Sequence, residues 1–251
     1  MIICNSHNFA VTRAPKTGGT SLELYILESG LVDTATDTYA LEGGFSTWQE
    51  FKAYSDAHDN LNYMEIKKDL WGEEALKDAQ TTFLSLVEQG RVQPDMPCIG
   101  GIRHPLEWLA SLYYYANTRN RANTARNIKE HGKPSEYNVA MEAGYGEPDA
   151  SWDLVFRKID NLQYIKDILR PQTSYYPEHV TLFNIENLHE HVSNFIVSKG
   201  GPAPTERMQA RISSNDPTYY LDNLSADRKQ RTLEIYEKDL IAWEKAYEVH
   251  N

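Results

Sequence analysis

The chain has 251 residues and a formal net charge of −11, with 41% hydrophobic and 24% charged residues. This length suits one large α/β domain, predicted over residues 1–251, and the acidic balance argues against nucleic acid or an anionic membrane surface as partner. No apolar run is long enough to cross a bilayer, and the first residues do not form a signal peptide. We therefore expect a soluble, cytoplasmic chain without a membrane span, in which Cys4 and Cys98 are buried free thiols.

The first motif is Phe9-Ala-Val-Thr-Arg-Ala-Pro-Lys-Thr-Gly-Gly-Thr-Ser-Leu22. It predicts a strand over 8–13, a glycine turn with one lysine, and a helix over roughly 20–29. Backbone N–H groups, a helix N-terminus and an ammonium group brought together in this way form a phosphate site. In a Walker A loop the lysine follows the second glycine, whereas Lys16 precedes Gly18 and Gly19, so the nucleoside-triphosphate pattern fails.

The second motif is Cys98-Ile-Gly-Gly-Ile-Arg-His-Pro-Leu-Glu-Trp-Leu-Ala-Ser-Leu-Tyr113. It predicts a buried strand that ends in Arg103 and a helix that begins at Pro105, because proline is favoured in the first turn. Ser111 is expected two turns along that helix. A planar guanidinium is well suited to phosphate oxygens, although a surface ion pair at a strand end is the simpler reading of an isolated arginine.

The rest of the chain alternates between strand and helix patterns. Helices are expected over 73–89 and 154–169, and a buried strand over 180–188 is followed by a helix through Phe195. We interpret residues 31–60 and 117–150 as substrate or lid insertions, the second with a basic segment over 117–133 that is either a lid or a solvated excursion. The predicted fold class is α/β, a doubly wound, mostly parallel sheet with helices on both faces.

The two motifs together resemble those of sulfotransferases that use 3′-phosphoadenosine 5′-phosphosulfate (PAPS). The resemblance implies a P-loop-like sulfotransferase fold and no metal. It assigns the 5′-phosphosulfate to the first motif and the 3′-phosphate to Arg103 and Ser111. The cofactor-binding residues expected from the first motif are Lys16, Thr17, Gly18, Gly19, Thr20 and Ser21.

The later segments extend this resemblance to residues 8–247, and it is nearest to the carbohydrate (Golgi-type) enzymes. Arg211-Ile-Ser-Ser-Asn-Asp-Pro-Thr-Tyr-Tyr220 is similar to the family's C-terminal polar loop near the cofactor, which adds Arg211 and Ser214 to the expected contacts. Relatives usually carry an asparagine where Ile212 or Ser213 stands here. The acceptor is expected to be a hydroxyl of a glycan or small molecule, and neither its identity nor the oligomeric state can be derived from the sequence.

The catalytic residues predicted are Lys16 and His58. Lys16 would stabilise the departing phosphate, and His58 would accept the acceptor proton, since several carbohydrate-type relatives place a catalytic histidine between the two motifs. An ordinary loop histidine is the competing interpretation of His58, with Asp56, Asp59 and Glu42 as fallback bases. Two other functions stay open: a P-loop-type nucleotide kinase or phosphotransferase, and an inert nucleotide-binding module.

Overall fold

The computed structural model describes residues 2–32, 37–39, 83–114, 147–153, 156, 169–205 and 218–248. Two compact units are built from alternating parts of the chain. Unit 1 comprises Met1–Ile102, Gln172–Ile212 and Ala242–Asn251, and unit 2 comprises Arg103–Pro171 and Ser213–Ile241. The single domain expected over residues 1–251 stays a prediction.

Unit 1 contains a five-stranded sheet in the order β3-β1-β2-β4-β5. Its strands are β1 (Ile2–Cys4), β2 (Phe9–Val11), β3 (Thr38–Tyr39), β4 (Cys98–Ile102) and β5 (Thr181–Asn184). β2, β4 and β5 pair in parallel, whereas β1 is antiparallel to both β2 and β3. Every strand except β1 therefore points in the same direction, which confirms the predicted α/β class with a mostly parallel sheet.

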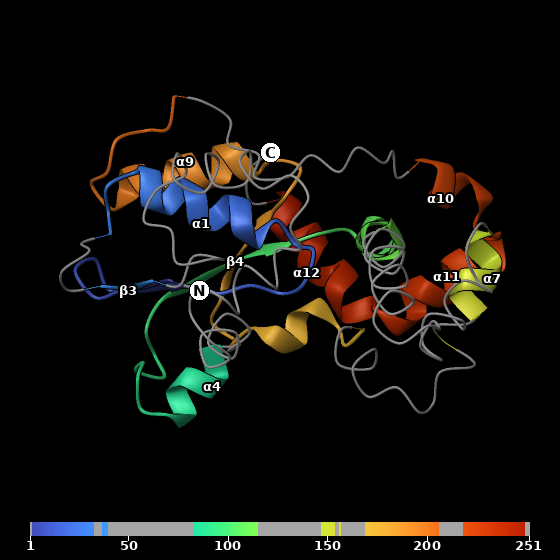
Figure 1. Ribbon diagram of the computed structural model, residues 1–251, viewed down its shortest axis with the longest axis horizontal. Helices are drawn as coiled ribbons and strands as arrows, with labels where there is room; N and C mark the ends of the chain where they lie inside the picture. The colour runs from blue at the N-terminus through green and yellow to red at the C-terminus, as the bar shows by residue number, and fades with distance from the viewer. Residues whose placement is uncertain are drawn as a thin grey trace, which may run out of the picture. The chain divides into compact units, whose positions relative to one another are not determined.

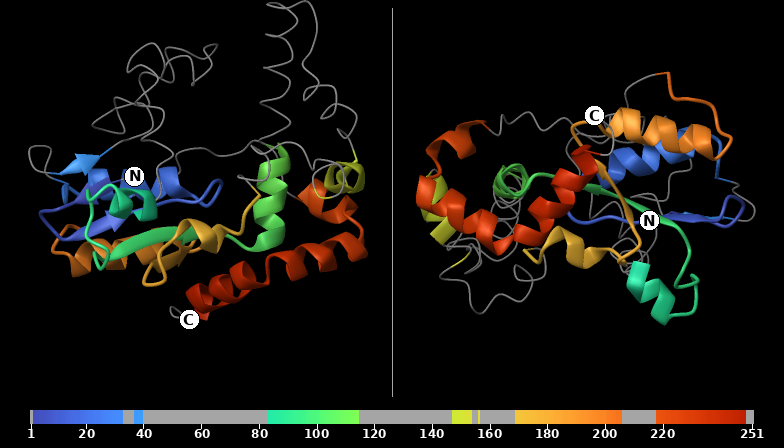
Figure 2. Two further views of the ribbon diagram at one scale, coloured as in Figure 1. Left: turned by 90° about the horizontal axis from the view of Figure 1, so that it is seen from below. Right: turned by 180° about the vertical axis from the view of Figure 1, so that it is seen from behind.

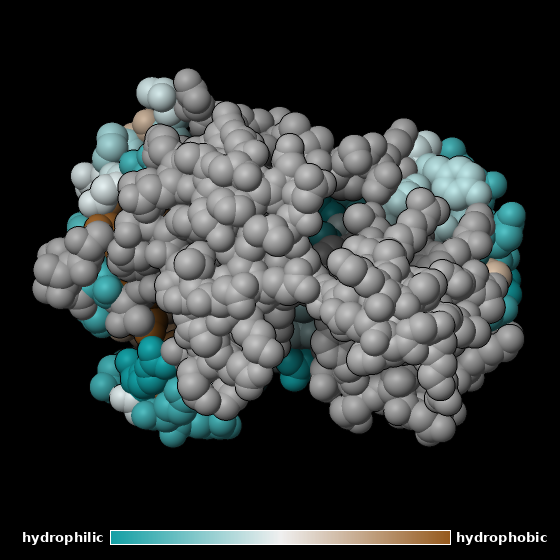
Figure 3. Space-filling view, viewed as in Figure 1, coloured by the Kyte–Doolittle hydropathy of each residue, from teal (hydrophilic) through white to brown (hydrophobic). Residues whose placement is uncertain are grey.

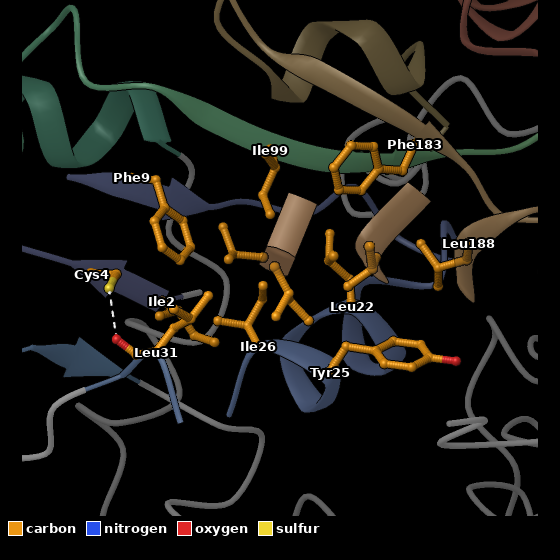
Figure 4. Packing of buried hydrophobic residues seen from close by; sticks show 13 residues of the cluster. Ile2, Cys4, Phe9, Leu22, Tyr25, Ile26, Leu31, Ile99, Phe183 and Leu188 are labelled. Atoms are coloured by element: carbon orange, nitrogen blue, oxygen red, sulfur yellow. Dashed lines mark hydrogen bonds between the residues drawn. The ribbon is translucent and has the colours of Figure 1, made fainter. Parts of the chain in front are cut away.

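Helices pack on both faces of this sheet. α1 (Gly19–Glu28) and α9 (Leu188–Ser198) cover one face, and α4 (Phe83–Glu88) lies on the other (Figures 1 and 2). Strand side chains point from the sheet toward α1 and meet aliphatic side chains of that helix in the main core (Figure 4). The main cluster consists of Ile2, Cys4, Phe9, Val11, Leu22, Tyr25, Ile26, Leu31, Ile99, Phe183, Leu188, Val192 and Ile196.

Alternation along each strand assigns neighbouring residues to opposite faces. Ile3, Ala10 and Cys98 join the α4 side, together with Phe83 and Leu86. Cys4 belongs to the α1 and α9 side, so the two cysteines lie on different faces of the sheet. Both are buried free thiols, as predicted.

The outer surface of the α4 region is hydrophilic (Figure 3). Within α4, Phe83 and Leu86 are buried whereas Glu88 is exposed, and the segment after the helix adds exposed polar residues such as Arg91 and Asp95. This pattern is that of a short amphipathic element with one face in the core and one in solvent.

The turn between β1 and β2 is held by a carboxylate from outside it. Asp37 is buried, and its Oδ1 accepts hydrogen bonds from the backbone N–H groups of Asn5 and Ser6 at 2.7 and 3.0 Å. Its Oδ2 accepts a third from the Ser6 hydroxyl at 2.8 Å. These bonds fix the hairpin that places β2, and hence the segment after it.

Unit 2 is helical in its described part. It contains a helix over residues 105–114, α7 (Pro148–Asp153), α10 (Thr218–Asn223) and α11 (Ala226–Ile235). Arg228 joins α11 to α7 through Asp149 and Asp153, at 2.8 and 2.6 Å. α12 (Glu237–Glu248) starts in unit 2 and ends in unit 1.

The structure confirms the strands and helices expected at both motifs and at 180–195, and α4 lies within the helix expected over 73–89. β1, β3, α7 and α10 were not predicted, and α10 begins within the segment that was expected to be a polar loop. Only Phe156 and Leu169 of the helix expected over 154–169 lie among the described residues, and most of 31–60 and 117–150 falls outside them. Within the part of the chain that is described, no helix is long and apolar enough to span a membrane.

Candidate functional site

The loop between β2 and α1 has an unusual backbone conformation. Lys16 has a φ of 65°, which is uncommon for a residue with a side chain, and Gly18 has a φ of 73° at the N-cap of α1. These two left-handed residues, with Thr17 between them, turn the chain sharply from the end of the strand into the helix. The strand-loop-helix unit predicted from the first motif is therefore present, with α1 beginning at Gly19.

This loop rests directly on the neighbouring strands. A Cβ on Gly101 of β4 would collide with the carbonyl oxygen of Thr17. A Cβ on Gly18 would lie 3.3 Å from Cγ2 of Ile185, the residue after β5. The loop thus lies beyond the carboxyl ends of parallel strands, where α/β sheets usually bind ligands.

The electrostatics around the loop favour an anion. The first turn of α1 contains no acidic residue, so the partial positive charge of the helix N-terminus is not offset there. Lys16 is partly exposed. Lys16 and the N–H groups at the start of α1 therefore both contribute positive charge at this loop.

Arg13, at the start of the loop, has a different environment. Its Nη1 lies 3.5 Å from Oε2 of Glu23, whose side chain is fully buried in α1. The Arg13 side chain also covers Gly19, because a Cβ there would come within 2.6 Å of the arginine Cβ. Arg13 therefore compensates a buried carboxylate and packs over the first residue of α1.

The second motif begins with β4 in unit 1, and its helix, with Arg103 and Ser111, belongs to unit 2. Arg103 follows the last residue of β4 directly, and its side chain is half-buried with a buried Nε. Ser111 is half-buried on the helix over 105–114. His104 precedes this helix, and its Nδ1 accepts the Leu106 N–H at 3.3 Å, which is a capping role.

Several predicted site residues lie outside the described part of the chain. They are His58, Arg211 and Ser214, together with the fallback bases Asp56, Asp59 and Glu42. Among the residues that are described, no group of three or more histidine, cysteine, aspartate or glutamate side chains could hold a metal ion.

Tyr176 is a residue of this site that the sequence patterns missed. It follows the 3₁₀ helix η2 (Gln172–Tyr175), and its ring lies against Gly100, where a Cβ would come within 2.7 Å of ring atom Cε1. The pair Gly100-Gly101 was the available signal, because glycine inside a strand often marks close approach by another part of the chain.

No family model, curated protein or solved structure matches this chain.

Proposed function

We propose that this protein is a PAPS-dependent sulfotransferase that moves the sulfuryl group to an acceptor hydroxyl, in the first place of a carbohydrate. The observation that carries the proposal is the left-handed lysine loop between β2 and α1, in the order Pro15-Lys-Thr-Gly-Gly-Thr-Ser-Leu22. Arg103 at the end of the adjacent parallel strand supports it. With this function we propose the finer fold as well, a doubly wound P-loop-like sulfotransferase fold.

PAPS carries two separate phosphate groups, and each of the two motifs supplies donors for one of them. We assign the 5′-phosphosulfate to Lys16 and the N–H groups of Thr17 to Thr20, with the Ser21 hydroxyl. We assign the 3′-phosphate to Arg103 and Ser111, which are each partly exposed. Arg211 and Ser214 stay in the proposal as further contacts.

PAPS supplies an activated sulfuryl group when it is bound. Transfer forms a bond between the acceptor oxygen and sulfur and breaks the bond between sulfur and the bridging phosphate oxygen. By analogy with phosphoryl transfer, the transition state is loose, and negative charge grows on that bridging oxygen. Lys16 meets this charge with its ammonium group, while the first N–H groups of α1 hold the phosphate.

His58 is the proposed general base that takes the proton from the acceptor hydroxyl. A His58→Ala variant is expected to keep its affinity for 3′,5′-adenosine bisphosphate and to lose 10²–10⁴-fold in transfer rate, the usual contribution of a general base. Calorimetry and a radiolabel transfer assay measure the two quantities on the same preparation. An unchanged transfer rate would remove His58 from the mechanism and leave the fallback carboxylates.

The experiment that tests the proposed function is calorimetric titration with 3′,5′-adenosine bisphosphate, beside ADP and AMP, without added metal. We expect the bisphosphate to bind most tightly, and we expect an Arg103→Ala variant to bind it about 10- to 100-fold more weakly. This range follows from the roughly 1.5–3 kcal/mol of a charge-assisted hydrogen bond and from 1.4 kcal/mol per tenfold change in affinity.

Arg91→Ala is the charge-matched control, because Arg91 is an exposed arginine after α4 and should not affect affinity. A preference for ADP or ATP, or a requirement for magnesium, would contradict the proposal and favour a nucleotide kinase. Tight binding of the bisphosphate without transfer to any acceptor would favour an inert nucleotide-binding module.

A further inference from the structure

The hydroxyl group of Tyr176 lies at the centre of the contacts that hold the lysine loop. It donates a hydrogen bond to the carbonyl oxygen of Gly101 at 2.6 Å and accepts one from the backbone N–H of Ala14 at 2.9 Å. The Thr17 hydroxyl lies 3.2 Å away. One phenol oxygen thus connects the backbone of β4 with two residues that flank Lys16.

Thr17 completes this arrangement within the loop. Its hydroxyl donates to the carbonyl oxygen of Ala14 at 2.9 Å, which ties the residue after Lys16 to the residue two before it. The Thr17 side chain is fully buried, and Tyr176 is 5% exposed. Neither side chain faces solvent, so neither hydroxyl is placed to contact a ligand.

The bonds are made on the two sides of the strained residue. A left-handed backbone is unfavourable for a lysine, and such a conformation persists only where its surroundings impose it. The Tyr176 hydroxyl contacts the Ala14 N–H and the Thr17 hydroxyl, and the Thr17 carbonyl oxygen packs closely against Gly101. The direction in which the Lys16 side chain points is consequently set by Tyr176, which is far away in the sequence.

We propose that Tyr176 is a positioning residue for the anion site, and that it acts through Ala14 and Thr17 to hold Lys16 and the following N–H groups in the conformation that binds phosphate. This role rests on the proposed function. Preorganisation of this kind raises affinity because the loop does not have to be ordered when the ligand arrives.

Tyr176→Phe tests this role, because the variant keeps the ring against Gly100 and removes only the hydroxyl. Tyr236→Phe is the matched control: Tyr236 is also a buried tyrosine, and its hydroxyl donates to the Leu169 carbonyl at 2.7 Å in unit 2. Three quantities are measured on each variant without acceptor: the thermal midpoint, amide hydrogen exchange over residues 13–21, and the Kd for 3′,5′-adenosine bisphosphate.

Both variants are expected to lose thermal stability, and Tyr176→Phe should lose more, because the Tyr176 hydroxyl bonds to both Gly101 and Ala14 whereas the Tyr236 hydroxyl bonds to Leu169. Only Tyr176→Phe should exchange faster over residues 13–21, and only this variant should bind the bisphosphate about tenfold or more weakly. A purely structural tyrosine would lower the thermal midpoint and leave the Kd unchanged.

The outcomes separate this inference from the function on which it rests. The positioning role is overturned if Tyr176→Phe leaves amide exchange over residues 13–21 unchanged, or if exchange is faster but the Kd for the bisphosphate is unchanged. In both cases the proposed function stands as long as the wild-type protein binds the bisphosphate. Absence of bisphosphate binding by the wild-type protein overturns the proposed function, and the positioning role is rejected with it, even if exchange over the loop is faster.

Discussion

Replacing Lys16 by asparagine is expected to lower the rate of sulfuryl transfer by about 10²–10³-fold, the usual effect of removing one group that stabilises developing charge in a transition state. Asparagine is the informative choice, because it tolerates the left-handed backbone that Lys16 adopts at φ 65°. The charge is removed and the turn is kept. The measurement is single-turnover transfer from radiolabelled PAPS to an acceptor selected with the wild-type protein.

Two further variants at this position separate charge from conformation. Lys16→Gly removes the charge and relieves the left-handed strain, so its thermal midpoint should equal or exceed that of the wild type while transfer is lost. Lys16→Arg keeps a cation and should retain part of the rate. A Lys16→Asn rate within threefold of the wild type would show that this lysine does not stabilise the leaving group.

A Gly101→Ala variant is expected to lose both stability and ligand binding. The added methyl group would occupy the position of the Thr17 carbonyl oxygen, and neither β4 nor the loop is a flexible side-chain end that can move aside. Overpacking of this kind costs about 1–3 kcal/mol of folding free energy. Because the strand is fixed by two parallel neighbours, we expect the loop to move and the affinity for 3′,5′-adenosine bisphosphate to fall at least tenfold.

Gly201→Ala is the control for this prediction. Its added Cβ would meet only side-chain atoms, Cγ2 of Ile196 at 2.8 Å and Cδ2 of Leu31 at 3.1 Å. It should therefore reduce stability in urea unfolding without changing the Kd. Equal losses of affinity in both variants would mean that the Gly101 effect reflects general destabilisation and not displacement of the loop.

The parts of the fold that could be predicted carry local signals. Gly18-Gly19 after an apolar strand predicted the turn into α1, and Pro105 after a run of buried residues predicted the start of the next helix. Each of these signals lies within about ten residues of the element it specifies. For this reason the β2-loop-α1 unit and the segment from β4 into its helix were both predicted correctly.

The parts that could not be predicted depend on contacts between distant segments. β1 has three residues and β3 has two, which is too short for any alternation to be recognised. Tyr176 lies 162 residues from Ala14, and no spacing in the sequence connects them. In the same way, Asp37 lies 32 residues from Asn5 and 31 from Ser6, the two hairpin residues whose N–H groups it accepts. The strand order and the contacts that hold the loop therefore required the structure.

The two buried cysteines lie on opposite faces of the sheet, so the reactivity of each thiol reports on the helices that cover its face. Burial raises the pKa of the Cys98 thiol to about 12, and it also raises the pKa of Cys4, so neither is a reactive thiolate near neutral pH. An alkylating reagent can then modify either sulfur only after the structure around it opens. Because Cys4 lies under α1 and α9 while Cys98 lies on the α4 side, their separate modification rates distinguish detachment of one helical layer from detachment of the other.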